Sequence, residues 1–166
     1  MLPRTIKWLI GLNARLNGIR HSDLPQSMRK ELARAALRLS APGRFAMPNP
    51  IRLMDYSISY FREWELRFLF HEIFEAGNYL FTTDRSRPLI LDCGSNIGMS
   101  ILFFKKLYPE ARIIGFEPDP LTYERLKSNV EQNGLRDVAL NNCALTDRDG
   151  SVEFYREKDM IGGGAA

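Results

Sequence analysis

Apolar side chains recur at helical spacing in three segments of the first half of the chain. Residues 5–17 and 25–39 are predicted to form helices, and residues 57–75 are predicted to be helical in one or two pieces. The stripe of the second segment consists of Met28, Leu32, Ala35, Ala36 and Leu39. The aromatic face of residues 57–75, formed by Phe61, Trp64, Phe68 and Phe74, is typical of a packed core. Residues 42–50 hold three prolines and predict a loop.

Short apolar runs alternate with helical segments in the second half. Leu89–Leu91 follows a proline and precedes a glycine turn, which predicts a strand buried on both faces. Residues 97–107 predict a crossover helix that ends before Pro109, and residues 112–116 predict a second strand. The segment therefore begins as a β-α-β unit.

A second unit follows directly. Asp119 is a helix cap and Pro120 suits the first helical position. Residues 138–145 predict a third strand, and residues 151–155 predict an antiparallel strand along its edge. Right-handed crossovers place both helices on one face of the sheet, in the strand order third, second, first. The fold class is α/β and Rossmann-like, behind a helical N-terminal extension.

Charge divides the chain at the same place. The formal net charge is +3, but residues 1–55 carry ten Lys/Arg against three Asp/Glu, and residues 56–166 carry thirteen against seventeen. We therefore expect a basic helical extension over 1–55 and the body of the domain over 56–166. A basic helix face is most often simply solvated. Peripheral contact with a membrane surface is the alternative, and no nucleic-acid partner is expected.

The two cysteines favour a reducing, cytoplasmic compartment. Cys93 and Cys143 end strands that are separated by another strand, roughly 10 Å apart across the sheet, which is too far for a disulfide. The chain has no run of about 18 apolar residues that predicts a transmembrane helix.

The turn after the first strand has the features of a ligand site. Gly94 and Gly98 remove side chains where a ligand approaches, and Asn96 tolerates left-handed dihedral angles. The helix that follows offers free backbone N–H groups. Glu117 ends the second strand, and ligands of open α/β sheets sit at the carboxyl ends of strands. A carboxylate there suits the two hydroxyls of a ribose.

The spacing of the turn distinguishes between nucleoside cofactors. A dinucleotide fingerprint is G-x-G-x-x-G, whereas this turn is D-x-G-x-N-x-G with Asp92 at its head. An acid at this place repels a phosphate and can meet an ammonium group. The pattern favours S-adenosylmethionine over a nicotinamide or flavin cofactor. A plain strand-to-helix connection is the alternative for the turn alone.

These residues resemble the FkbM-type methyltransferases over about residues 70–156. The motifs that carry the resemblance are residues 92–98 (Asp-Cys-Gly-Ser-Asn-Ile-Gly), 115–120 (Gly-Phe-Glu-Pro-Asp-Pro), 126–129, 133–134, 143–145 and 149–150. The resemblance implies a class I methyltransferase fold, a three-layer sandwich with S-adenosylmethionine as methyl donor. It also implies O-methylation of a hydroxyl on a sugar, a polysaccharide or a natural product.

The resemblance also implies which residues bind the donor. Those near the methionine part are Asp92, Gly94, Ser95, Asn96 and Gly98, the ribose lies on Glu117, and Cys143 with Ala144 lies near the adenine. The remaining strands of the complete sheet, with the acceptor side, have no counterpart here. We therefore expect an incomplete domain that is inactive alone, and we name no catalytic base.

Two other functions and one metal motif remain to be weighed. A nicotinamide-dependent Rossmann enzyme and a non-catalytic nucleotide-binding module are the alternatives. The stretch His71-Glu72-Ile73-Phe74-Glu75 lacks the second histidine of H-E-x-x-H, so no metal site is expected and a surface role is predicted for His71.

Overall fold

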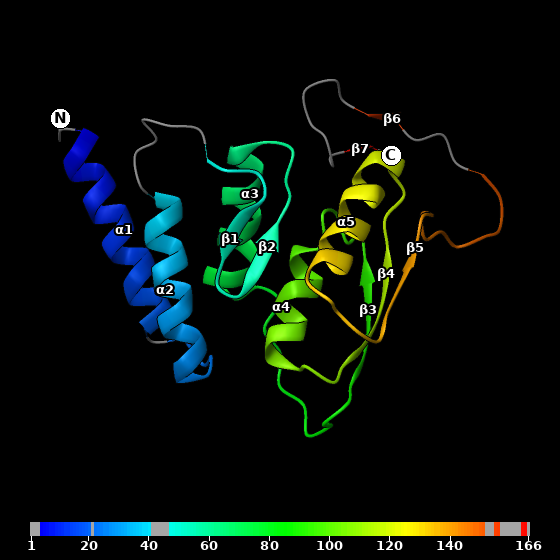
Figure 1. Cartoon of the computed structure of the whole chain (residues 1–166), viewed down its shortest axis with the longest axis horizontal. Helices are drawn as coiled ribbons and strands as arrows, with labels where there is room; N and C mark the ends of the chain where they lie inside the picture. Colours follow the sequence, from blue (N-terminus) through cyan, green and yellow to red (C-terminus); the bar gives the residue numbers. More distant parts are fainter. Residues whose placement is uncertain (1–3, 21, 41–46, 152–154, 157–163, 166) are drawn as a thin grey trace.

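The computed structural model describes residues 4–20, 22–40, 47–151, 155–156 and 164–165 (Figure 1). The elements are α1 Arg4–Arg20, α2 Gln26–Ser40, β1 Ile51–Leu53, β2 Tyr56–Ile58, α3 Glu63–Phe70, a π-helical turn His71–Glu75, β3 Leu89–Cys93, α4 Met99–Leu107, β4 Arg112–Phe116, α5 Pro120–Gln132, β5 Val138–Asn141, β6 Tyr155–Arg156 and β7 Gly164–Ala165. No helix in these described ranges has both the length and the apolar character needed to cross a bilayer.

A parallel three-stranded sheet in the order β3-β4-β5 forms one side of the molecule. Helices α4 and α5 lie between this sheet and the N-terminal elements, as Figure 1 shows. The helix cap at Asp119 is also present, since its side chain accepts a hydrogen bond from Thr122 N at 2.9 Å. The predicted α/β fold, its strand order and its single helical face are therefore confirmed.

The predicted burial of the first strand on both faces is wrong. Ile90 and Asp92 point to the helices and are buried, whereas Leu89 and Leu91 are 55% and 60% exposed. Because both helices cover one face, alternate residues of β3 stay on an uncovered face within the described residues. The uninterrupted apolar run gave no indication of this difference.

The third strand is shorter than predicted. It ends at Asn141, because the side-chain amide of Asn142 turns to donate to Glu117 O at 2.8 Å and to Pro118 O at 3.2 Å. The predicted edge strand lies largely outside the described residues. Its last residue, Tyr155, pairs with Ala165 and not with the third strand.

Helices α1 and α2 run side by side at the N-terminal end of the molecule (Figure 1). The predicted stripe of α2 is confirmed, because its five members are all buried: Met28, Leu32, Ala35, Ala36 and Leu39. Its basic side chains Lys30, Arg34 and Arg38 are exposed.

A β-hairpin replaces the first part of the predicted helix 57–75. Strands β1 and β2 pair antiparallel through a turn in which Met54 has a φ of 53°. Asn129 of α5 and Asn133, which caps the end of that helix, hold the hairpin. Asn133 Oδ1 accepts from Ser57 N and Asn129 Oδ1 accepts from Ser59 N, both at 2.8 Å. The expected boundary between residues 55 and 56 falls between the two strands of this hairpin.

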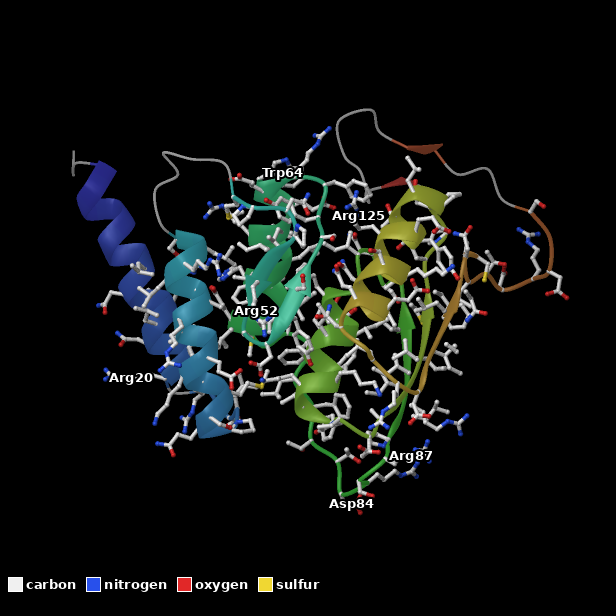
Figure 2. The ribbon with its side chains drawn as sticks, viewed as in Figure 1. Arg20, Arg52, Trp64, Asp84, Arg87 and Arg125 are labelled. Atoms are coloured by element: carbon white, nitrogen blue, oxygen red, sulfur yellow. The ribbon has the colours of Figure 1, made fainter. Side chains whose placement is uncertain are left out.

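Helix α3 begins at Glu63, and its outer aromatic residues are not core residues. Trp64 and Phe68 are 51% and 58% exposed, so their predicted burial is wrong, whereas Phe70 and Phe74 stack at 5.0 Å inside the core. Figure 2 shows Trp64 at the same end of the molecule as Arg125 of α5. Arg125 lies 4.6 Å from the ring centroid of Phe61, which joins α5 to the segment before α3.

Candidate functional site

The turn after β3 is held against the end of β4. Gly94, Asn96 and Gly98 all have positive φ values, of 91°, 49° and 89°. Gly94 N and Ser95 N both donate to Phe116 O at 2.9 Å. The chain therefore reverses direction tightly beside the carboxyl end of the neighbouring strand.

Gly98 is the N-cap of α4 and lies close to α5. A Cβ atom at this position would lie 2.7 Å from Leu126 Cδ1 of α5, and the backbone has a left-handed φ. The left-handed backbone favours glycine, and any larger residue would also displace the end of the Leu126 side chain. The second glycine of the motif thus lets α5 pack against the start of α4.

Asp92, the acid at the head of the turn, is buried and held by α4. Its Oδ2 accepts from Ser100 Oγ at 2.7 Å, and its main-chain carbonyl accepts from Ser95 Oγ at 3.1 Å. Asp92 is 6% exposed and Ser95 is 2% exposed. This part of the turn is therefore preorganised by hydrogen bonds within the protein.

Glu117 lies where β4 ends and reaches back to the turn. Its Oε2 accepts from Asn96 N at 2.9 Å and its Oε1 accepts from Asp119 N at 3.0 Å. Burial raises the pKa of Glu117, and the charges of Asp119 and Asp92 act in the same direction, against the two backbone N–H donors. Each carboxylate oxygen keeps a further lone pair for a ligand hydroxyl.

A small hollow of about 260 Å³ lies beside the turn, at the carboxyl ends of the strands. Its lining residues are Cys93, Gly94, Phe116, Pro118, Cys143, Ala144 and Leu145. Ligand pockets usually measure about 300–1,000 Å³, so this hollow is sized for one part of a ligand. The two cysteines are free thiols and both are exposed.

The eight predicted site residues thus meet at one edge of the sheet. Asp92, Ser95, Asn96 and Glu117 are joined directly or through one neighbour by hydrogen bonds, and Gly94, Cys143 and Ala144 line the hollow. An acid-lined glycine turn next to a hollow of this size fits a nucleoside with a cationic side chain. It fits a pyrophosphate poorly, because Asp92 and Glu117 are both buried carboxylates.

Two residues at this edge received no role from the sequence: Asn129, which lies within the motif 126–129, and Glu65. Asn129 of α5 is fully buried, and its Nδ2 donates to Ile97 O at 2.8 Å and to Ser59 O at 2.9 Å, so it ties the turn to the end of the β-hairpin. Glu65 of α3 is 5% exposed, and its side chain lies beside Asn96. One feature of the sequence could have pointed to Glu65. It is an acidic residue directly before Leu66, on the apolar side of a helix.

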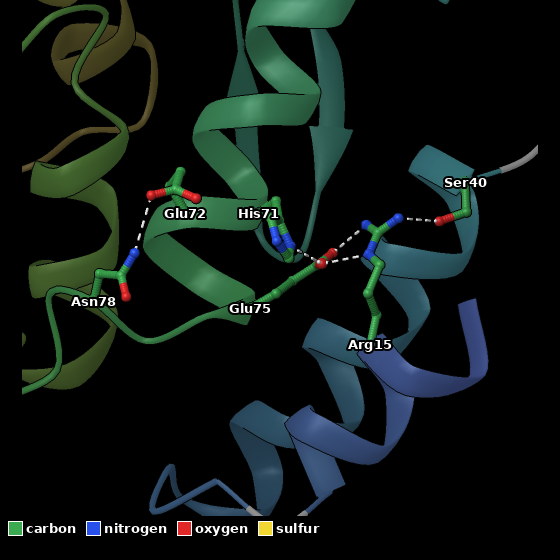
Figure 3. Close-up of polar contacts among 6 residues, drawn as sticks. All are labelled: Arg15, Ser40, His71, Glu72, Glu75 and Asn78. Carbon is green, nitrogen blue, oxygen red and sulfur yellow. Dashed lines mark hydrogen bonds and ion pairs between the residues drawn. The ribbon is translucent and has the colours of Figure 1, made fainter. Parts of the chain in front are cut away.

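His71 belongs to a polar cluster with Glu75 and Arg15 that includes none of the predicted donor-site residues (Figure 3). Glu75 accepts from Arg15 Nε and Nη2, both at 2.6 Å, and its Oε2 lies 2.9 Å from His71 Nδ1. Arg15 Nη1 also donates to Ser40 Oγ at 2.8 Å. The predicted surface position of His71 is confirmed by its 47% exposed side chain, and the cluster joins α1 and α2 to the π-helical turn.

Comparison with curated proteins gives four methyltransferases. Methyltransferase sdnD of Sordaria araneosa is 37% identical over 102 residues, which are 61% of this chain and 38% of that protein. The 31-O-demethyl-FK506 methyltransferase FkbM of Streptomyces tacrolimicus is 29% identical over 111 residues, which are 64% of this chain and 42% of that protein. The chain resembles FkbM-type methyltransferases. The predicted resemblance is confirmed.

The resemblance is partial in extent. The chain spans about 40% of the length of the first curated relatives that it matches. No family model matches the chain. The 2-O-methyltransferase NoeI of Sinorhizobium fredii is 35% identical over 72 residues, which are 43% of this chain and 29% of that protein.

Similar solved structures include TYW2 of Pyrococcus horikoshii in complex with MeSAdo, with a TM-score of 0.36 and 21% identity over 46% of this chain and 33% of that one. Coclaurine N-methyltransferase gives a TM-score of 0.38 at 13% identity, over 91% of this chain and 41% of that one. Superpositions at these scores assign no residue a role.

Proposed function

We propose that the chain carries the donor-binding part of an S-adenosylmethionine-dependent O-methyltransferase that acts on a hydroxyl of a sugar, a polysaccharide or a natural product. The observation that carries the proposal is Glu117. Its carboxylate is buried at the end of β4 and anchored to the glycine turn through Asn96 N. Two relatives, 31-O-demethyl-FK506 methyltransferase FkbM and 2-O-methyltransferase NoeI, are named for oxygen methylation, which supports the acceptor class.

The proposed roles follow the geometry of the turn. Glu117 accepts hydrogen bonds from the two ribose hydroxyls, and the hollow that Cys143 and Ala144 line takes the adenine. The methionine part lies along the turn, against Asp92, Gly94, Ser95, Asn96 and Gly98. When bound, the donor supplies an electrophilic methyl group on a sulfonium. The contribution of these residues is to fix that group in one orientation for an in-line attack by the acceptor oxygen.

The proposal extends to the organisation and location of the protein. Helices α1 and α2 form the basic extension, and the donor-binding unit begins with the β1–β2 hairpin, which spans the expected boundary between residues 55 and 56. The exposed Lys30, Arg34 and Arg38 of α2 support peripheral contact with an anionic membrane surface. The two free thiols support a cytoplasmic location.

Calorimetric titration of the chain with S-adenosylhomocysteine and with NAD tests the cofactor. We expect S-adenosylhomocysteine to bind and Glu117→Ala to weaken that binding about 10- to 100-fold, because hydrogen bonds to a buried charged group are lost. Glu124→Ala, on the exposed side of α5, is the matched control and should leave the affinity unchanged.

The alternatives give other results. Binding of NAD in preference to S-adenosylhomocysteine would favour a nicotinamide-dependent enzyme. If a folded chain binds neither S-adenosylhomocysteine nor NAD, the proposal is contradicted. The non-catalytic module is then the remaining alternative.

A further inference from the structure

Glu65 brings a third buried carboxylate to the glycine turn. It lies in the first turn of α3 and is 5% exposed. Burial raises its pKa, while the charge of Arg62 and a hydrogen bond with the Asn96 side chain oppose that effect. Asn96 therefore stands between two acids, with its backbone N–H on Glu117 and its side chain beside Glu65.

One oxygen of Glu65 lacks a partner. Its Oε2 is fully buried and has no hydrogen-bond partner among the described residues. Buried charges in proteins are normally paired, because an unpaired one loses the stabilisation that water gives it in the unfolded chain. A carboxylate left in this state beside a ligand-binding turn indicates that the ligand brings the missing donor.

The donor proposed above has two positive groups, and only one of them can satisfy an oxygen acceptor by hydrogen bonding. A sulfonium has no N–H group, whereas the ammonium group of the methionine part has three donors. Asp92, to which the sequence assigned this ammonium, accepts one hydrogen bond, from Ser100 Oγ through its Oδ2, and keeps acceptor sites that can share the three ammonium donors with Glu65. Glu65 Oε2 has no such partner among the described residues.

We propose that Glu65 Oε2 binds the ammonium group of the methionine part of the donor. The inference rests on the proposed function, since it assumes that S-adenosylmethionine occupies this turn. It assigns α3, an element before the recognisable motifs, a direct part in the donor site. Glu65 and Glu117 then hold opposite ends of the same ligand, with Asn96 between them.

Three ligands separate this role from others in calorimetric titrations of the chain. S-adenosylmethionine and S-adenosylhomocysteine both carry the ammonium, and 5′-methylthioadenosine carries the nucleoside without it. We expect Glu65→Gln to weaken the binding of the first two by the same factor, about tenfold or more, because a charge-assisted hydrogen bond is lost. The affinity for 5′-methylthioadenosine should not change.

Glu63→Gln is the matched control, because it removes an acid from the same helical turn. Glu63 Oε1 accepts from Met47 N at 2.6 Å, so this side chain is engaged away from Asn96. All three affinities should stay at their wild-type values in this variant. Glu65→Met, similar in size and uncharged, provides a second test, and circular dichroism melting verifies that each variant is folded.

The other outcomes overturn the assignment. Weaker binding of all three ligands would mean that Glu65 acts through the shape of the turn. Weaker binding of S-adenosylmethionine alone would place Glu65 at the sulfonium. If Glu65→Gln binds every ligand as the wild type does, Glu65 does not contact the methyl donor. If the wild-type chain binds neither S-adenosyl compound, the proposed function falls first and this inference falls with it.

Discussion

Two buried carboxylates on one continuous helical segment, Glu75 in the π-helical turn and Glu65 in α3, differ in what surrounds them. Glu75 is 8% exposed and accepts three hydrogen bonds from Arg15 and His71 (Figure 3). Glu65 is 5% exposed, and its Oε2 has no partner among the described residues. Burial is the same at the two positions, so burial alone does not distinguish their roles.

The two carboxylates differ in the source of their hydrogen-bond partner. The cation for Glu75 comes from α1 of the same chain, so the contact joins the N-terminal helices to the body of the molecule. Such a pair holds elements in place and leaves nothing for a ligand to satisfy. Glu65 keeps an acceptor for a group that arrives from outside. A buried acid is therefore informative about binding only after its partners have been counted.

The largest effect is expected from Arg15→Met, which removes the partner of Glu75. The carboxylate would remain buried with His71 alone, and we expect the free energy of unfolding to fall by about 2–3 kcal/mol in urea denaturation. This is below the roughly 3–5 kcal/mol for breaking a fully buried pair, because the Arg15 side chain is 30% exposed.

A double variant tests whether Arg15 and Glu75 stabilise the fold as a pair. Arg15→Met with Glu75→Met removes both partners and should recover part of the lost stability, since no buried charge is left unpaired. Arg20→Met, on the exposed end of the same helix, is the control and should change stability by less than about 0.5 kcal/mol. A double variant as unstable as the sum of its single changes would show that Glu75 is not held as a pair.

The sequence allowed the positions of the glycine turn and of Glu117 at neighbouring strand ends to be predicted. These residues follow one another closely at strand ends, where spacing along the chain translates directly into position. Residues 92–98 form a single turn after the first strand, and Glu117 stands at the end of the second strand. Parallel pairing of β3 with β4 then places these two segments side by side.

What could not be predicted depends on contacts between distant segments. The β1–β2 hairpin lacks an Asn-Gly or Asp-Gly signal, and contacts with Asn129 and Asn133, 70 and 76 residues away in sequence, hold it in place. The exposure of Leu91 depends on which face of the sheet the helices cover, which an apolar run does not encode. Glu65 likewise reaches the site only because α3 packs beside the turn.

A smaller effect on the free energy of unfolding is expected from Glu65→Gln in the absence of ligand. This variant should be more stable than the wild type, whereas Arg15→Met should be less stable. Burial raises the pKa of Glu65 in the folded chain, so the folded state holds this proton more tightly than the unfolded state. Stability is therefore lost as the pH rises from the unfolded pKa, near 4.3, through the folded one. The variant should match the wild type at pH 4 and exceed it at pH 8 by about 1–2 kcal/mol, the usual cost of an unsatisfied buried group.

Thermal or urea unfolding at the two pH values measures this difference. Glu117, whose pKa is also raised, is present in both proteins, so the comparison isolates Glu65. A variant that is less stable than the wild type at pH 8 would mean that the Glu65 carboxylate already has a stabilising partner in the free protein.

The smallest effect is expected from Glu72→Ala, in the same π-helical turn as Glu75. Glu72 Oε2 accepts from Asn78 Nδ2 at 3.0 Å, but this contact is exposed to solvent (Figure 3). Water replaces the lost partner at almost no cost, so the free energy of unfolding should change by less than about 0.5 kcal/mol. Urea denaturation of Glu72→Ala and Arg15→Met under the same conditions provides the test. It shows whether burial of the acid, and not the presence of a hydrogen bond, determines how much the contact contributes to stability. A loss from Glu72→Ala as large as that from Arg15→Met would remove the physical basis for contrasting Glu75 with Glu65.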